Sequence, residues 1–309
     1  MLHVRVPATS ANLGPGFDCL GLALDLWLDV RARAADRDRF AYRGEGAIPD
    51  TPDNLVHEGF RRGMAALGRT APAVAVEVDN PIPLARGLGS SSAALVAGAA
   101  LADAWSGGAL TREGVFQLAA SLEGHPDNVA PAVFGGFTVS APRAEGGYAT
   151  AVLALPPGWR LLFGVPDFDL PTEQARAALP ATVDRADAVR TAARAALWAL
   201  AVARDEPELL RTASLDVLHE PYREALVPGL REARASLREA GAHAAFLSGA
   251  GPTVAAVVDE ATESACRHAL AGFVGARGQV LALRSAGGYE VVRAGPTEHL
   301  GERPADDPT

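Results

Sequence analysis

Apolar residues in the first half of the chain alternate in short runs and recur at helical spacing in longer ones. The alternating runs predict strands, at 2–7, 20–32, 74–78 and 135–139. The longer runs predict helices, at 53–67, 93–105 and 111–122. Asp53 and Asn54 are the candidate N-caps of the first helix. The interval 8–19 is rich in glycine, proline and asparagine and is predicted to be a turn-rich connection.

The sequence Pro156-Pro157-Gly158 interrupts this pattern and marks a predicted domain boundary. Beyond it, strands are predicted at 160–165, 244–248, 253–258 and 279–284. Helices are predicted at 172–179, 184–203, 206–218, 227–240 and 260–274. Because strands and helices mix without regular alternation, we expect an α+β protein of two domains. The predicted domains are 1–157 and 158–300, followed by a frayed tail at 301–309.

The segment 81–94 gives the strongest indication of a ligand site, since it joins a predicted strand to a predicted helix. Gly87 and Gly89 can adopt positive φ and let the backbone approach a ligand closely. The free N–H groups and the dipole of the helix start favour an anion. Three consecutive hydroxyls can cap this helix or reach a phosphate or a metal, those of Ser90, Ser91 and Ser92. An ordinary capped helix after a flexible turn is the alternative interpretation.

Four further segments are polar or glycine-rich, at 7–18, 123–128, 169–176 and 248–253. Each has a structural explanation by itself: a turn, a glycine-capped helix end, a helix start capped by Thr172, and a glycine turn between strands. Their occurrence together with the segment 81–94 indicates a ligand site assembled from several loops.

Composition narrows the chemistry of that site. The 309-residue chain contains 28 arginines and no lysine. This excludes a Schiff-base lysine, a Walker-loop lysine and the strand lysine of protein kinases. A bound anion must be met by arginine, backbone N–H groups or a metal. Cys19 and Cys266 are too few for a disulfide framework and lack metal-ligand spacing.

Charge and hydropathy exclude two classes of partner. The net charge is −9 and the arginines are scattered, so the basic footprint of a nucleic-acid binder is absent. The sequence has no uncharged apolar run long enough to span a bilayer, and its N-terminal residues lack the features of a signal peptide. We therefore expect a cytoplasmic protein whose partners are neither nucleic acids nor membranes.

Three motifs occur in an order that resembles the GHMP kinase superfamily: VPATSANLGPGFD at 6–18, PLARGLGSS at 83–91 and SGAGPT at 248–253. The inner motifs EGHPDNVAP at 123–131, LPTEQAR at 170–176 and HEPYR at 219–223 resemble the homoserine kinases within it. The resemblance runs from about residue 3 to about residue 295.

The resemblance implies a two-domain GHMP kinase fold, with an N-terminal half like the second domain of ribosomal protein S5 and a ferredoxin-like C-terminal half. It implies transfer of the γ-phosphoryl group of ATP to the side-chain hydroxyl of L-homoserine, with Mg²⁺, for threonine biosynthesis. It also implies a homodimer. The alternatives are another small-molecule GHMP kinase, acting on mevalonate, shikimate or a sugar, and a catalytically silent member that binds a nucleotide or metabolite.

Site residues follow from the resemblance, position by position. The residues implied for ATP are Asn54, Pro83, Leu84, Ala85, Arg86, Gly87, Leu88, Gly89, Ser90, Ser91 and Ser92. Those implied for homoserine are Asn12, Asp18, His125, Arg176 and Arg223, and those implied in catalysis are His125, Asn128 and Arg176. The metal is assigned to Ser91 and Glu123.

Two chemical points stay open at this stage. In some members of the family the metal glutamate lies further upstream, near the position of Gln117, which has no carboxylate, so either Glu123 or no side-chain carboxylate binds the metal. Relatives use an aspartate as general base near Asn128, but an amide cannot accept the proton. We expect transition-state stabilisation without a protein base, with Asp127 as the alternative base.

Overall fold

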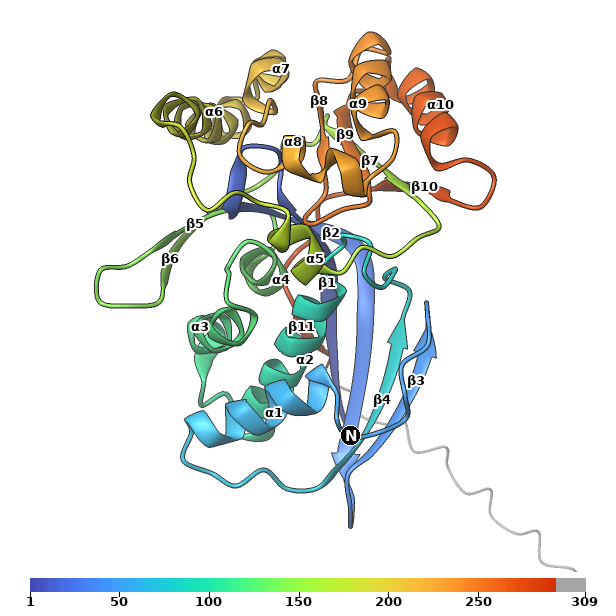
Figure 1. Cartoon of the computed structure of the whole chain (residues 1–309). Coiled ribbons are helices and arrows are strands. Elements are labelled where there is room, and N and C mark those ends of the chain that lie inside the picture. The colour runs from blue at the N-terminus through green and yellow to red at the C-terminus, as the bar shows by residue number, and fades with distance from the viewer. Residues whose placement is uncertain (293–309) are drawn as a thin grey trace, which may run out of the picture.

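The computed structural model describes residues 1–292, which form two β-sheets with helices packed against them (Figure 1). The first sheet and its helices occupy the lower part of Figure 1, and the second sheet and its helices occupy the upper part. The mixed succession of strands and helices agrees with the α+β class expected from the sequence.

The first sheet has seven strands in the order β11-β1-β2-β4-β3, and β5 and β6 extend it from β2. Its pairs are antiparallel except β3 with β4. Alternating apolar residues of β1 and β2, such as Val4, Val6 and Leu28, are buried in the core. The strands are β1 (Leu2–Asn12), β2 (Gly16–Ala34), β3 (Arg39–Gly44), β4 (Val74–Asn80), β5 (Phe137–Pro142), β6 (Tyr148–Leu153) and β11 (Glu290–Val292).

Four helices accompany this sheet: α1 (Leu55–Ala66), α2 (Ser90–Trp105), α3 (Thr111–Glu123) and α4 (Val129–Phe134). Helix α2 lies in their midst and is apolar almost all round, with a nearly continuous buried run from Ser92 to Ala102. Gly98 lets α1 approach α2 closely, because a Cβ there would lie 2.1 Å from the carbonyl oxygen of Val56. This close packing holds α2 against α1.

The second sheet has four antiparallel strands in the order β10-β7-β9-β8. All five residues of β9 are buried. Val254, Ala256 and Val258 belong to an apolar cluster with residues of α9 and α10, and Ala255 and Val257 belong to the larger core cluster on the other face. The strands are β7 (Arg160–Val165), β8 (Ala244–Leu247), β9 (Val254–Val258) and β10 (Gln279–Leu283). The helices are α5 (Thr172–Ala177), α6 (Arg185–Arg204), α7 (Leu210–Ala213), α8 (Glu220–Arg223), α9 (Leu230–Glu239) and α10 (Glu263–Val274), with 3₁₀ turns at Pro207–Leu209 and Glu224–Leu226.

The chain returns to the first sheet after β10. Strand β11 pairs with β1, Gly287 bridges to Gly135, and Arg112 Nη2 donates to the carbonyl oxygen of Tyr289 at 2.9 Å. The predicted segment 158–300 is therefore not confined to the second sheet. The boundary at 157/158 itself stays a prediction, and the predicted tail at 301–309 lies outside the described residues.

Two sequence-based expectations about elements are wrong. Most of the interval 8–19 is strand, because β1 continues to Asn12 and β2 begins at Gly16. The helix expected at 206–218 is only a 3₁₀ turn and the single turn of α7. There, Asp216 accepts hydrogen bonds from the backbone N–H groups of Leu218, His219 and Glu220, which holds the chain in a turn.

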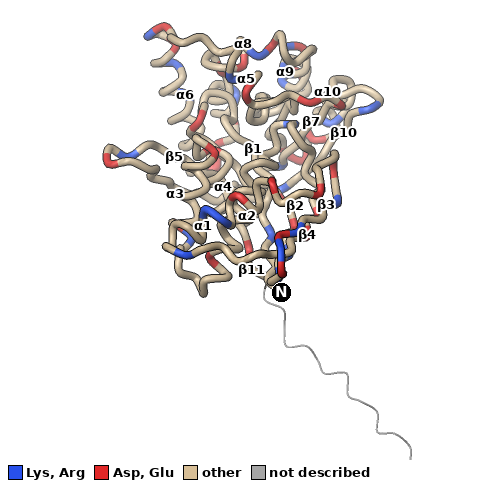
Figure 2. Tube along the Cα trace, turned by 60° about the horizontal axis from the view of Figure 1, so that its bottom comes forward, with Lys and Arg blue, Asp and Glu red and all other residues tan. Residues whose placement is uncertain are grey.

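Acidic and basic residues are interspersed along the chain trace (Figure 2). Within residues 1–292, the structure contains no helix with the length and apolar character needed to cross a membrane.

Candidate active site

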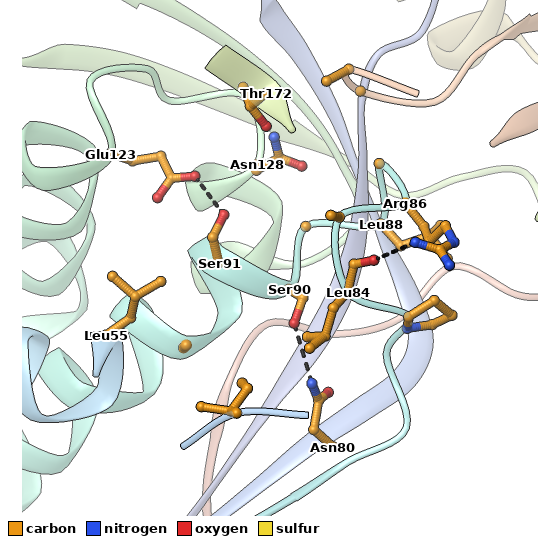
Figure 3. Close-up of a pocket in the computed structure, with 18 of the residues that line it drawn as sticks. Leu55, Asn80, Leu84, Arg86, Leu88, Ser90, Ser91, Glu123, Asn128 and Thr172 are labelled. Atoms are coloured by element: carbon orange, nitrogen blue, oxygen red, sulfur yellow. Dashed lines mark hydrogen bonds between the residues drawn. The ribbon is translucent and has the colours of Figure 1, made fainter. Parts of the chain in front are cut away.

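A cavity of about 390 Å³ lies at the start of α2 and is lined by residues of both halves of the chain. The glycine loop, defined as residues 83–89, forms its middle. In Figure 3, Leu55 and Asn80 lie to one side of the start of α2, and Asn128 and Thr172 lie to the other. We call the first side the apolar end (Phe40, Tyr42, Ile48, Leu55, Val56 and Val78) and the second side the polar end (Asn12, Phe17, His125, Asp127, Asn128, Thr172, Arg176 and Arg223).

Two positions of the glycine loop accept only glycine. Gly87 has φ +75°, and a Cβ there would lie 2.1 Å from the carbonyl oxygen of Ser248. Gly89 has φ +71°, and a Cβ there would lie 2.0 Å from Thr9 Oγ1. Both the positive φ and the close approach of neighbouring atoms therefore exclude a side chain.

Contacts from both sheets hold the glycine loop. Thr9 N donates to the carbonyl oxygen of Leu88 at 3.1 Å, and Ser248 Oγ donates to that of Gly87 at 2.7 Å. Leu170 N donates to the carbonyl oxygen of Ala85 at 3.0 Å. Arg86 Nε donates to the carbonyl oxygen of Pro166 at 3.0 Å, and Arg86 also pairs with Asp169. The loop is thus held in place before any ligand binds.

The start of α2 differs from an ordinary capped helix. Its N-cap is Gly89, and no side chain there makes a capping hydrogen bond. Ser91 Oγ and Ser92 Oγ instead donate to Glu123 Oε1, at 3.0 and 2.8 Å, while Ser90 Oγ accepts from Asn80 (Figure 3). The N–H groups of the first turn are therefore left for a ligand, as an anion site requires.

The apolar end contains two aromatic rings. Phe40 and Tyr42 are stacked with ring centroids 6.5 Å apart. The hydroxyl of Tyr42 accepts from Asn80 Nδ2 at 3.1 Å, and the same amide nitrogen donates to Ser90 Oγ at 3.2 Å. Asn80 thus connects the apolar end to the start of α2. The sequence alone did not indicate Phe40 and Tyr42, because aromatic residues in a short strand look like ordinary core.

The side chain of Asn54 is used within its own helix start. Its Oδ1 accepts from His57 N at 3.0 Å, and its Nδ2 donates to the carbonyl oxygen of Thr51 at 2.8 Å and lies 3.0 Å from His57 Nδ1. It is therefore the N-cap of α1, one of the two caps expected, although it also lines the cavity.

Asp18 and Arg176 form a two-pronged ion pair at the polar end, with Nη1–Oδ2 and Nη2–Oδ1 distances of 3.1 and 2.5 Å. The hydrogen bond to Asp18 raises the pKa of Arg176 against the opposing effect of burial. Asn12 supports Asp18, because its Oδ1 accepts from Asp18 N at 3.0 Å and its Nδ2 donates to the carbonyl oxygen of Gly249. About a third of each charged side chain remains accessible to solvent.

Arg223 is a buried cation, only 1% exposed. It donates to the carbonyl oxygens of Ala175 and Gly249, at 3.2 and 3.1 Å, and to His219 Nδ1 at 3.0 Å. Burial, followed by the charge of Arg176, lowers the pKa of Arg223 to about 10, so it stays charged at neutral pH. Both arginines lie within cation–π distance of the Phe17 ring, with guanidinium-to-centroid distances of 5.2 Å for Arg176 and 5.5 Å for Arg223.

His219 is a neutral acceptor for Arg223. Burial lowers the pKa of His219 to about 4, so the imidazole is uncharged at neutral pH. Its Nε2–H then donates to the carbonyl oxygen of Gly14 at 2.8 Å, which leaves Nδ1 free to accept from Arg223. This side chain therefore ties Arg223 to the turn between β1 and β2.

His125, Asp127 and Asn128 follow the glycine cap that ends α3. His125 Nδ1 lies 2.7 Å from Asp127 Oδ1, and Asn128 N donates to the same oxygen at 3.1 Å. Burial alone would lower the pKa of His125, but the hydrogen bond and charge of Asp127, with Glu123, outweigh it and raise the pKa. The result is an imidazole at the cavity wall that holds its proton more strongly than a free histidine.

Gln117 has a structural role. Its Nε2 donates to the carbonyl oxygen of Tyr148 at 2.7 Å, and its Oε1 accepts from Tyr148 N at 3.0 Å. This pair of hydrogen bonds fixes the start of β6 to α3, and Gln117 does not line the cavity. Glu123, which the serine hydroxyls contact, is the carboxylate placed beside the start of α2.

Family models match both halves of the chain. The model for the GHMP kinases N-terminal domain matches residues 54–136, and the model for the GHMP kinases C-terminal domain matches residues 196–275. The chain belongs to the GHMP kinase family. Its two-domain GHMP kinase fold, expected from the motifs, is confirmed.

Relatives of this GHMP kinase include several homoserine kinases. It is 52% identical to a homoserine kinase of Thermus thermophilus over 287 residues, covering 93% of this chain and 97% of the relative. The crystal structure of a homoserine kinase from Cytophaga hutchinsonii matches with a TM-score of 0.84 at 25% identity, covering 94% of this chain and 97% of the other. A putative homoserine kinase structure from Listeria monocytogenes matches with a TM-score of 0.80 at 34% identity, covering 96% and 100%.

Nearly all the site residues expected from the sequence line one cavity in this GHMP kinase. The exceptions are Asp18, which pairs with the lining residue Arg176, and Ser92, which donates to the lining residue Glu123. Thr172 does not cap α5 as expected, because Pro171 is the N-cap, and its side chain instead lines the cavity beside Asn128 (Figure 3). The roles of these residues in binding and catalysis stay predictions.

Proposed function

We propose that this chain is a homoserine kinase, which transfers the γ-phosphoryl group of ATP to the side-chain hydroxyl of L-homoserine in threonine biosynthesis. The identity of 52% to a homoserine kinase over 93% of the chain supports this assignment. The structural observation that carries it is one cavity that joins a glycine loop at a helix start to a polar end with two arginines, one of which pairs with Asp18. The glycine loop suits the phosphates of a nucleoside triphosphate, and the polar end suits the charged groups of an amino acid.

ATP would lie along the glycine loop. The free N–H groups of the first turn of α2 suit the phosphates, and the stacked Phe40 and Tyr42 suit the base. Because the chain has no lysine, the backbone supplies most of the donors in the loop. Arg86 is turned to Pro166 and Asp169, so it holds the loop rather than the phosphates.

Ser91 and Glu123 fit a bound Mg²⁺. They place a hydroxyl oxygen and a carboxylate oxygen 3.0 Å apart at the start of α2, and Mg²⁺ prefers oxygen ligands of this kind. When bound, the ion would neutralise charge on the phosphates. Ser92 donates to the same carboxylate oxygen and orients it from the buried side.

Homoserine is a zwitterion, and the polar end offers complementary charges. Its carboxylate would face Arg223 and Arg176, and its ammonium group would face Asp18. The ion pair of Asp18 with Arg176 can accept both charges without leaving either side chain unpaired. Asn12 and His125 line the same end and would help to place the hydroxyl near the γ-phosphate.

The transfer requires positioning and charge stabilisation. The homoserine hydroxyl oxygen forms a bond to the γ-phosphorus while the bond to the β–γ bridging oxygen breaks, releasing ADP and O-phospho-L-homoserine. The hydroxyl proton passes to an oxygen of the transferred phosphoryl group, since Asn128 cannot act as a base. His125, whose pKa is raised by Asp127, and the amide of Asn128 would stabilise the negative charge of the transition state.

The proposal extends to the oligomeric state and the cellular location of the chain. We propose a cytoplasmic homodimer with a domain boundary at 157/158. Val189 and Leu200 on α6 are 63% and 52% exposed and provide apolar surface for a second copy. Sedimentation velocity distinguishes the dimer from a monomer.

ADP release tests the function. The chain is mixed with Mg-ATP and, in separate reactions, L-homoserine, L-serine, mevalonate or shikimate. We expect turnover with homoserine far above that with the other alcohols. Preferred turnover of another alcohol would instead identify a different GHMP kinase, and ATP binding without turnover would identify a catalytically silent member.

A further inference from the structure

Thr9 is a polar residue in a strand that is buried on both faces. It lies in β1 and is fully buried, so its hydroxyl must find a partner inside the protein. That partner is Asn128, because Thr9 Oγ1 donates to Asn128 Oδ1 at 2.9 Å. The two residues are 119 positions apart in sequence, so the bond joins β1 to the residue before α4.

The glycine loop meets Thr9 at the same point. A Cβ on Gly89 would lie 2.0 Å from Thr9 Oγ1 and 3.1 Å from Asn128 Oδ1. Thr9 N also donates to the carbonyl oxygen of Leu88. Thr9 is therefore packed against the tip of the loop, where its hydroxyl has little room to turn away from Asn128.

The hydrogen bond holds the amide of Asn128 with its oxygen toward Thr9. A side-chain amide has an acceptor oxygen and a donor nitrogen, and exchanging them reverses what it presents to a ligand. With Oδ1 taken by Thr9, the donor Nδ2 is turned away from β1, and Figure 3 shows it on the side of Thr172. Among the residues described, Thr9 is the only side chain that hydrogen-bonds the side chain of Asn128.

We propose that Thr9 is a positioning residue, which orients the Asn128 amide so that its NH₂ group, not its oxygen, faces the transferred phosphoryl group. This inference rests on the proposed kinase function. A reversed amide would present its oxygen to phosphoryl oxygens, which repel it, and a donor would be lost as negative charge develops. Loss of this orientation should therefore lower the rate of phosphoryl transfer more than the binding of either substrate.

The test compares Thr9→Val, which has nearly the same shape without the hydroxyl, with Thr9→Ser, which keeps the hydroxyl. We expect Thr9→Val to lower kcat about 10- to 100-fold, in line with the loss of one aligned donor, while Thr9→Ser stays within about threefold of the wild type. The KM values for ATP and homoserine should change by less than about threefold in both variants, because Thr9 lies behind the ligand surfaces.

A double-mutant cycle separates this role from a structural one. If Thr9 acts through Asn128, adding Thr9→Val to Asn128→Ala should lower kcat by less than about twofold further. Binding of a fluorescent ATP analogue and the melting temperature report folding. Should Thr9→Val fail to fold, Thr9→Ala removes the hydroxyl without adding a methyl group and takes its place.

Three results bear against the inference or its basis. An unchanged kcat in Thr9→Val, or equal losses in Thr9→Val and Thr9→Ser, would refute the positioning role. Full additivity with Asn128→Ala would show that Thr9 acts by another route. Failure of the wild-type chain to release ADP in the presence of homoserine would refute the proposed function itself. The wild-type assay is therefore carried out before any variant is measured.

Discussion

The glycine loop and the polar end of the cavity are built on different principles. The loop is one continuous stretch of chain, and it presents backbone N–H groups at the start of α2. The polar end presents charged side chains, and its principal ion pair joins Asp18 to Arg176 across 158 positions of sequence. A local motif therefore specifies the first surface, whereas the second exists only once both halves have folded together.

The two surfaces also tolerate change differently. The loop needs space, since Gly87 and Gly89 are packed against atoms of both sheets. The polar end depends on the positive charge of Arg223. This side chain is buried, and its partners are carbonyl oxygens and one neutral histidine, which carry no opposite charge. Added volume should therefore disturb ATP binding, and lost charge should disturb homoserine binding.

The largest effect is expected for Arg223→Ala. If Arg223 binds the substrate carboxylate as proposed, removing this buried cation should raise the KM for homoserine about 100-fold or more and change the KM for ATP by less than about threefold. Steady-state kinetics with each substrate varied measure this split. Arg231→Ala, which removes an exposed arginine paired with Glu224, is the control. A parallel rise of both KM values would mean that Arg223 is structural or shared by both substrates.

Gly87→Ala tests the loop in the same way. The new Cβ would meet the Ser248 carbonyl oxygen at 2.1 Å, so the loop must shift and the KM for ATP should rise about tenfold. Gly107→Ala is a matched control, because its φ of +79° imposes similar strain with no atom within 4 Å. Equal behaviour of the two variants would show that backbone strain, not the close approach, explains the choice of glycine.

Asp127→Asn probes the chemistry between the two surfaces. The variant keeps an acceptor for His125 but loses the charge, so kcat should fall by less than about 100-fold. Without the charge of Asp127, the pKa of His125 is lower than in the wild type, so the imidazolium is lost at a lower pH. The deficit in kcat should therefore grow as the pH rises from 6 to 8. A loss of 100-fold or more throughout that range would instead identify Asp127 as a general base.

The smallest effect is expected for Asn54→Ala at the apolar end. Its amide is committed to capping α1, so the substitution should reduce the free energy of unfolding by about 1 kcal/mol. The KM for ATP should change by less than about twofold. Urea denaturation and ATP titration measure the two quantities, with Asp53→Ala as the neighbouring control. A large rise in the KM for ATP with unchanged stability would assign Asn54 to the nucleotide base.

The sequence predicts local features of this molecule better than distant ones. The strand at 160–165 and the helix end near Glu123 follow from short-range patterns, and the structure has them at those places. The strand at Ala8–Asn12 was missed because Thr9, Ser10 and Asn12 look like turn residues. Their side chains bond Asn128, Ser248 and Gly249, which no local pattern reveals.

The same distinction between local and distant features applies to the site residues. The motifs placed the glycine loop, Glu123 and the arginines, but nothing in the sequence indicated that Phe17 contacts both Arg176 and Arg223 or that His219 accepts a hydrogen bond from Arg223. The side chain of Gln117 could be assigned only after β6 was seen beside α3.

The contacts of the glycine loop have a consequence for how the molecule comes apart. The loop is hydrogen-bonded to the second half of the chain at three places: Arg86 to Pro166, Ala85 to Leu170, and Gly87 to Ser248. Pulling the halves apart must break all three bonds and leave the loop without its supports. Nucleotide affinity is thus a property of the assembled chain: a fragment ending at residue 157 would carry the whole glycine motif and still lack the framework that gives it shape.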